Sequence, residues 1–251
     1  MALMEGRAGF VTGAGAGIGE AIAKRIAAEG ASVVVADVDD AGGERVVREI
    51  TEAGGTASYL HVDVSSEDDV RAMVDAVVER YGTLDFAMNN AGIGHLPVPL
   101  HEMETAQYDK VMAIDARGVF LGLKYAIAYM REHDIAGSIV NTASGTGLKA
   151  SKGLTAYVTS KHAAVGLTRM AAIDYAEHGI RVNAVAPGSV KTPQMVAQPA
   201  DIVAGYEALM PSKRMARPEE IAAAVVWLLS DEASYVSGDI VEVDFGYLQA
   251  G

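Results

Sequence analysis

The chain has 251 residues, half of them hydrophobic, so it is long enough to bury a sizeable core. Its 20 basic and 33 acidic residues give a formal net charge of -13, and such a surface repels nucleic-acid phosphates and anionic lipids. The absence of cysteine excludes disulfide bonds and thiolate metal sites and fits a reducing compartment such as the cytoplasm.

Neither a leader nor a membrane span is expected from the hydrophobic pattern. Met1–Gly9 lacks the apolar stretch of a signal peptide. The longest apolar run, Ile221–Leu229, is far shorter than the roughly 20 residues that cross a bilayer. We therefore expect a soluble cytoplasmic protein with neither a nucleic-acid nor a membrane partner.

Short apolar runs alternate with longer helical patterns, which is typical of a parallel sheet covered by helices on both faces. Val33–Ala36 is apolar at every position, as expected for a strand buried on both faces. With no internal repeat or linker-like segment, one α/β domain is the simpler interpretation. The predicted strands are Ala8–Thr12, Ser32–Ala36, Ala57–Val62, Leu84–Met88, Ser138–Thr142, Arg181–Ala186 and Ile240–Val243.

A glycine-rich turn follows the first predicted strand and leads into a helix that begins near Ile18. Gly13, Gly17 and Gly19 have the spacing G-x-x-x-G-x-G, not the strict G-x-G-x-x-G. Glycines let backbone N–H groups approach a pyrophosphate, and a helix N-terminus favours that anion. The turn therefore predicts a dinucleotide site, although an ordinary glycine-rich turn remains the alternative.

Asp37 ends the second predicted strand, close to where an acid meets the adenosine ribose in dinucleotide-binding folds. A carboxylate accepts hydrogen bonds from both ribose hydroxyls and repels a 2′-phosphate. Ala16 and Val38 are not basic, so NAD is favoured over NADP. Asp37 could instead only cap a turn.

Two further strand ends carry residues suited to a cofactor. Asp63 and Val64 follow the third strand, and Asn90, Ala91 and Gly92 follow the fourth. Ligands of open α/β sheets bind outside the carboxyl ends of the strands. Asp63 could accept a hydrogen bond from adenine, and the small turn could leave room for ribose, but both segments could equally be simple turns.

Tyr157 and Lys161 lie four residues apart in a predicted helix and therefore share one face. A free tyrosine loses its proton near pH 10, and a nearby cation favours the phenolate. Ser144 follows the fifth strand, where its hydroxyl could hold a substrate oxygen while Tyr157 exchanges a proton. An exposed helix pair and a serine cap are the alternatives.

In order, these motifs resemble those of the short-chain dehydrogenase/reductase family, and the resemblance extends to Pro187, Gly188 and Thr192. It implies one seven-stranded Rossmann domain over residues 1–251 that binds a nicotinamide dinucleotide, with a substrate loop at about 188–215. It also implies that Lys161 bonds the nicotinamide ribose, that residues 187–192 line the nicotinamide, and that the chain forms a homotetramer.

Asp115 departs from the family pattern, since similar proteins carry asparagine there. In the family, that asparagine helps to hold a water linking the active-site lysine to solvent. An aspartate keeps the acceptor oxygens, loses the amide donor and adds a charge. We therefore expect Asp115 to support this water-mediated link between Lys161 and solvent, while shifting the pH dependence of turnover.

The leading hypothesis is hydride transfer between NAD(H) and a small, largely apolar secondary alcohol or ketone. A 3-oxoacyl-(acyl carrier protein) reductase and a non-catalytic dinucleotide sensor are the alternatives, and the histidine spacing suggests no metal site. Asp37 and the acidic surface disfavour the reductase, and retention of all three catalytic candidates disfavours the sensor. The predicted substrate residues are Ser144, Tyr157, His95, Leu148, Val190 and Met195.

Overall fold

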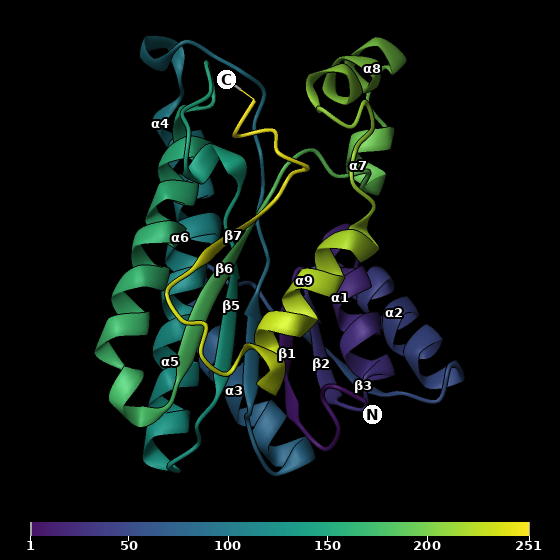
Figure 1. Ribbon diagram of the computed structural model, residues 1–251, viewed down its shortest axis with the longest axis vertical. Coiled ribbons are helices and arrows are strands. Elements are labelled where there is room, and N and C mark those ends of the chain that lie inside the picture. Colours follow the sequence, from purple (N-terminus) through teal and green to yellow (C-terminus); the bar gives the residue numbers. More distant parts are fainter. Residues whose placement is uncertain (1, 251) are drawn as a thin grey trace.

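The computed structural model describes residues 2–250, where seven strands form one sheet. Every neighbouring pair is parallel, in the order β3-β2-β1-β4-β5-β6-β7 (Figure 1). The strand order reverses between β1 and β4, which is where open α/β sheets bind ligands. The strands are β1 (Ala8–Thr12), β2 (Ser32–Asp37), β3 (Thr56–His61), β4 (Phe86–Asn89), β5 (Ser138–Thr142), β6 (Arg181–Pro187) and β7 (Ile240–Val243).

The predicted strands are all confirmed, and β1, β5 and β7 have the predicted bounds. The largest difference is in β4, which begins at Phe86 and not at Leu84. Asp85 explains this shift because its carboxylate accepts a hydrogen bond from the Ala8 N–H at 2.9 Å. Its side chain thus caps the start of β1, and regular pairing begins one residue later.

Helices cover both faces of the sheet, as predicted (Figure 1). Adjacent residues of β1 point to opposite sides: Val11 packs in the cluster that includes α1, α2 and α9, and Phe10 in the cluster that includes α3, α5 and α6. No helix within residues 2–250 is long and apolar enough to span a membrane. The covering helices are α1 (Gly17–Ala28), α2 (Asp40–Glu52), α3 (Glu67–Tyr81), α5 (Gly118–Glu132), α6 (Thr155–Asp174) and α9 (Pro218–Leu229).

Three short helices lie near the carboxyl ends of the strands. Helix α4 (Thr105–Val111) runs through a π-helical segment, Met112–Arg117, directly into α5. Helices α7 (Pro193–Val196) and α8 (Ala200–Leu209) bury none of their residues and project beyond the sheet (Figure 1). The predicted substrate loop therefore contains helices that are free to face a ligand.

A buried chain of hydrogen bonds ties α6 to the middle of the sheet. Asn89 Nδ2 donates to Asn141 Oδ1 at 2.8 Å, and Asn141 Nδ2 donates to Thr168 Oγ1 at 2.9 Å. Thr168 Oγ1 then donates to the Ala164 carbonyl at 2.8 Å. These bonds fix the helix that carries Tyr157 and Lys161 relative to β4 and β5.

We predict that Thr168→Val lowers the free energy of unfolding by about 1–3 kcal/mol, because the buried Asn141 amide loses its acceptor. Urea unfolding measures this change. Thr159→Val is the matched control, since Thr159 makes the same hydroxyl bond to its i-4 carbonyl on the exposed face of α6. Equal stabilities of the two variants would show that the buried chain contributes nothing.

Candidate active site

The glycine turn after β1 is shaped by close backbone packing. Gly13 and Gly17 have φ of +62° and +59°, a region that favours glycine. A Cβ on Gly13 would lie 2.8 Å from Ala91 Cα, and one on Gly19 would lie 2.1 Å from the Gly13 oxygen. Helix α1 begins at Gly17 without a side-chain cap, so its first N–H groups, that of Ile18 included, can meet an anion.

Asp37 faces this turn from the end of β2. Its Oδ2 accepts a hydrogen bond from Gly15 N at 2.7 Å, and its Oδ1 accepts one from Asp39 N at 3.0 Å. Asp37 therefore caps the turn and also presents a carboxylate beside it. Val38 follows with 59% of its surface exposed, so no basic side chain adjoins the carboxylate there.

Asn90 links the glycine turn to the neighbouring strands. Its Nδ2 donates to the Thr12 carbonyl at 3.0 Å, and its Oδ1 accepts from Thr142 Oγ1 at 3.2 Å. Thr12 Oγ1 in turn accepts from the backbone N–H groups of Asn90 and Ala91 at 2.9 and 3.0 Å. The Asn90 amide thus supports the turn, while Ala91 and Gly92 line the site with backbone.

Asp63 stabilises the turn after β3 through hydrogen bonds to Ser65, as in the alternative to adenine binding. Its Oδ1 accepts hydrogen bonds from Ser65 N at 2.9 Å and Ser65 Oγ at 2.7 Å, and the residue is exposed after β3. Val64 is buried, and a Cβ on Gly118 would lie 2.9 Å from Val64 Cγ2. Asp63 therefore lies at the correct edge of the sheet, with part of its carboxylate engaged locally.

Lys161 and Asp115 form a buried ion pair next to Tyr157. Lys161 Nζ lies 3.2 Å from Asp115 Oδ2, and the two side chains are 3% and 0% exposed. The same Nζ donates to the Thr142 carbonyl at 3.2 Å and lies 5.4 Å from the centre of the Tyr157 ring. Helix α6 therefore brings the phenol and the ammonium together, and the π-helical segment adds a carboxylate.

The opposite charges of the pair affect each other's protonation. Burial raises the pKa of Asp115, outweighing the Lys161 ammonium and the Ile93 N–H, which lower it. Burial lowers the pKa of Lys161, but Asp115 and Tyr157 together outweigh burial and the net shift is upward. The lysine therefore keeps its proton, and the pair places little net charge beside Tyr157.

Backbone groups complete the surroundings of this pair. Ile93 N donates to Asp115 Oδ1 at 2.8 Å. Oδ2 faces only Lys161, without a hydrogen bond of regular geometry. A Cβ on Gly92 would lie 3.0 Å from Oδ2 and 3.2 Å from Lys161 Nζ. Because Gly92 has no side chain, it leaves room for the ion pair.

Ser144 lies between β5 and a short 3-10 turn. Its Oγ accepts from Thr146 N at 3.2 Å and Thr146 Oγ1 at 3.0 Å, so it caps that turn. Both bonds use Oγ as acceptor, which leaves its proton for a further partner. His95 also approaches this region, because its Nε2 accepts a long bond of 3.4 Å from Tyr157 N.

The segment after β6 lies across the glycine turn. A Cβ on Gly17 would be 3.2 Å from Thr192 Cγ2, and Thr192 Oγ1 caps α7 by accepting from Met195 N at 3.3 Å. Pro187 ends β6, and Gly188 N donates to the Val243 carbonyl at 3.2 Å. This segment therefore adjoins the glycine turn.

The predicted substrate residues do not all face one space. Val190 is 7% exposed and packs in the core beside α9, so its side chain is not free to meet a substrate. Leu148 is half-buried against Ala143 and its neighbours, and Met195 is half-buried on α7. Tyr157 and His95 are brought together most clearly, through the bond from Tyr157 N to His95 Nε2.

Several contacts of the site could not be recognised from the sequence. Ile93 and Thr142 act through backbone atoms, for which side-chain motifs give no signal. Leu248 lies beside the site as well, since a Cβ on Gly145 would be 3.6 Å from it. Only the apolar character of the last residues hints at such a role.

Comparisons with known proteins agree with this architecture. A family profile described as enoyl-(acyl carrier protein) reductase matches residues 13–248. A 2,5-dichloro-2,5-cyclohexadiene-1,4-diol dehydrogenase of Sphingobium indicum is 44% identical, covering 98% of this chain and 99% of its own. A cis-4-hydroxycyclohexanecarboxylate dehydrogenase of Sinomonas cyclohexanicum is 43% identical, covering 96% of each chain.

A solved structure is also similar to this chain along its whole length. The crystal structure of levodione reductase superimposes with a TM-score of 0.94 at 40% identity, covering 99% of this chain and 100% of that one. Together with the matched profile and the dehydrogenase relatives, this shows that the chain is an oxidoreductase that belongs to the short-chain dehydrogenase/reductase family, whose members bind a nicotinamide dinucleotide.

Proposed function

We propose that this protein interconverts a small, largely apolar cyclic secondary alcohol and its ketone, using NAD(H). The observation that carries the proposal is Tyr157 beside the buried Lys161 ammonium, with the Ser144 hydroxyl at the neighbouring strand end. The names of two relatives, a cyclohexadiene-diol dehydrogenase and a hydroxycyclohexanecarboxylate dehydrogenase, support a ring substrate.

Each catalytic residue has a distinct role in alcohol oxidation. Ser144 donates its free proton to the substrate oxygen and holds it, while the Tyr157 phenolate accepts the hydroxyl proton. A nicotinamide bound here would supply the acceptor for the carbon-bound hydrogen, taken as hydride. Lys161 stabilises the phenolate and would hold the nicotinamide ribose, and ketone reduction would use the same groups in reverse.

The residues present fit a dinucleotide along the carboxyl edge of the sheet. The narrow turn at Gly13, Gly17 and Gly19, which a Cβ would fill, suits the pyrophosphate. Asp37 suits the adenosine ribose diol and opposes a 2′-phosphate, so we propose NAD as the cofactor. The remaining proposed contacts come from Val38, Asp63, Val64, the segment 90–92 and the segment 187–192.

The substrate is proposed to lie over Ser144 and Tyr157, between His95, Leu148 and the helices α7 and α8. Exposed apolar residues of these two helices, among them Val196 and Ile202, favour an apolar ring. An acidic acyl carrier would meet a chain of net charge -13, which disfavours the 3-oxoacyl carrier-protein alternative.

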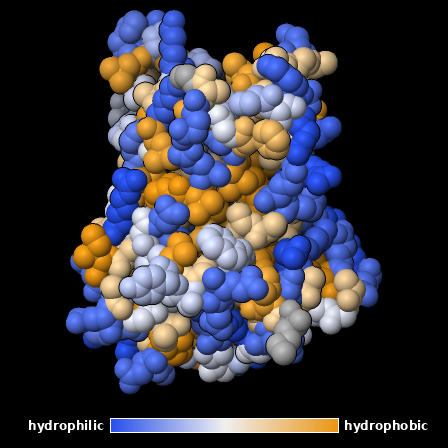
Figure 2. All heavy atoms as spheres, in the orientation of Figure 1, coloured by the Kyte–Doolittle hydropathy of each residue, from blue (hydrophilic) through white to orange (hydrophobic). Residues whose placement is uncertain are grey.

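We further propose that the single domain assembles as a homotetramer in the cytoplasm. Strand β7 is an edge strand, and Figure 2 shows hydrophobic residues gathered over the upper ends of β6 and β7. Helices α5 and α6 also expose Phe120, Met170 and Ile173, the last with 78% of its surface. Exposed apolar surface of this extent is typical of subunit contacts.

A screen of cyclic secondary alcohols with NAD and NADP tests the proposal. We expect NADH formation from ring alcohols, with kcat/KM at least about tenfold higher for NAD, since a carboxylate faces the 2′ position. Turnover with NADP alone would refute the cofactor assignment. Dinucleotide binding without turnover of any alcohol or ketone would favour the sensor alternative.

A further inference from the structure

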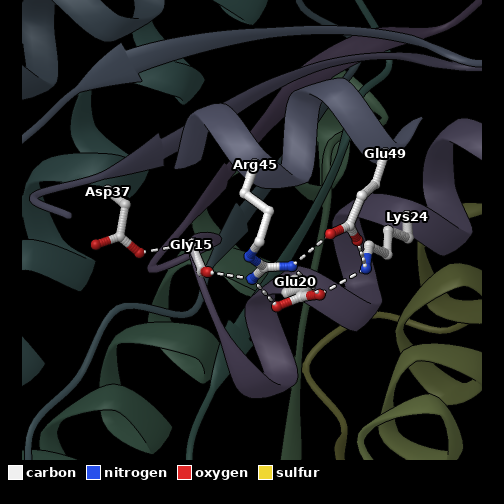
Figure 3. Close-up of polar contacts among 6 residues, drawn as sticks. All are labelled: Gly15, Glu20, Lys24, Asp37, Arg45 and Glu49. Atoms are coloured by element: carbon white, nitrogen blue, oxygen red, sulfur yellow. Dashed lines mark hydrogen bonds and ion pairs between the residues drawn. The ribbon is translucent and has the colours of Figure 1, made fainter. Parts of the chain in front are cut away.

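Four charged side chains form a cluster between α1 and α2, next to the glycine turn (Figure 3). This ion cluster consists of Glu20 and Lys24 on α1 and Arg45 and Glu49 on α2. Arg45 Nη1 donates to Glu20 at 2.9 Å and to Glu49 at 3.0 Å, and its Nη2 donates to Glu20 at 2.6 Å. Lys24 Nζ lies 2.5 Å from both carboxylates, so each cation faces both anions.

One glycine connects this ion cluster to the proposed ribose site. Arg45 Nη2 also donates to the Gly15 carbonyl at 3.0 Å, while Gly15 N donates to Asp37 Oδ2 at 2.7 Å. Helix α2 packs tightly here, since a Cβ on Gly15 would lie 3.3 Å from Gly43 N. A guanidinium, the group best suited to bind a phosphate, therefore contacts the same glycine as the carboxylate proposed to meet the ribose.

The contacts within the cluster keep this guanidinium occupied. Both terminal nitrogens of Arg45 donate to carboxylates, and Glu20 is only 18% exposed. Burial raises the pKa of Glu20, but the hydrogen bonds from Arg45 and Lys24 lower it overall. Hydrogen bonds from Lys24 and Arg45 likewise lower the pKa of Glu49. The carboxylates therefore stay charged at neutral pH and neutralise both cations.

We propose that the ion cluster is a second determinant of cofactor choice, in which Glu20 and Glu49 withhold Arg45 from the adenosine 2′ position. The inference rests on the proposed use of NAD. The net charge that a 2′-substituent meets is then negative and comes from Asp37, with Asp39 and Asp40 following it in the chain. Replacing Asp37 alone removes repulsion without adding attraction, and Arg45 becomes a phosphate ligand only once the cluster is opened.

The test measures adenine-half binding by calorimetry, with 5′-ADP and 2′,5′-ADP as probes, so that no catalytic residue takes part. We expect Asp37→Ser to bind 2′,5′-ADP better than the wild type does. Adding Glu20→Gln and Glu49→Gln should improve that binding by a further tenfold or so, the effect of one charge-assisted contact. Compared with Asp37→Ser itself, the two added substitutions should change the affinity for 5′-ADP by less than about threefold, which reports an intact turn.

Two further variants identify the cause of the gain. Adding Arg45→Met to the triple variant should abolish the extra tenfold, because Lys24 alone cannot replace the guanidinium. The control adds Glu44→Gln and Glu52→Gln to Asp37→Ser, which removes the same charge from exposed positions of α2 and should give no such gain.

The possible failures are distinguishable. If the triple variant gains nothing, if Arg45→Met keeps the gain, or if the exposed pair reproduces it, the role assigned to Arg45 is wrong. If instead the wild type binds 2′,5′-ADP more tightly than 5′-ADP, the proposed use of NAD is itself refuted.

Discussion

Tyr157→Phe is expected to lower kcat for alcohol oxidation by about a thousandfold while leaving NADH affinity within about twofold of the wild type. The phenyl ring keeps its place above Lys161, whose Nζ lies 5.4 Å from the ring centre, so only the proton acceptor is lost. Steady-state rates and fluorescence titration with NADH measure the two quantities.

Tyr175→Phe is the matched control, because it makes the same change just beyond the other end of α6. Its rate should stay close to that of the wild type. If Tyr157→Phe retained more than about a tenth of the activity, another group would have to transfer the proton, and the assignment would fail.

The fold could be predicted from the sequence because its determinants are local. Runs such as Val33–Ala36 are buried on both faces, and each ends where polar or glycine residues begin. The start of β4 could not be predicted, since it depends on the Asp85 contact with Ala8 across two strands. Long-range contacts of this kind leave no periodic signal.

In the candidate site, contacts within one helix could be predicted from the sequence, and contacts between distant segments could not. Tyr157 and Lys161 share a helix face at a fixed spacing, so their proximity follows from helix geometry. The π-helical segment that turns Asp115 toward Lys161 has no sequence signature and is known only from the structure. Arg45 resembles any charge on a solvated helix, because its partner Gly15 contributes a backbone oxygen.

Asp115→Asn is expected to move the pH profile of oxidation toward acid by about one unit, equivalent to ~1.4 kcal/mol. With the carboxylate gone, the Lys161 charge is no longer neutralised and stabilises the Tyr157 phenolate more strongly. Oxidation should therefore begin at lower pH. The Ile93 N–H bond survives, because the amide oxygen of asparagine can accept it at the position of Oδ1.

The alkaline side of the profile should move in the same direction. The Asp115 carboxylate raises the pKa of Lys161 against the effect of burial, so its removal lowers that pKa. A lower folded-state pKa means that the Lys161 ammonium loses its proton at lower pH. The activity that depends on this cation is then lost at lower pH as well. Both limbs of the profile are therefore expected to shift to lower pH.

Rates with saturating NAD and alcohol, measured across the accessible pH range, give the shift directly. Asp109→Asn is the control, since it makes the same substitution at an exposed position of α4, which leads into the π-helical segment. Superimposable profiles for wild type and Asp115→Asn would show that the carboxylate has no electrostatic effect on the proton transfer. A shift toward alkali would contradict the expected sign, and the electrostatic role assigned to Asp115 would be wrong.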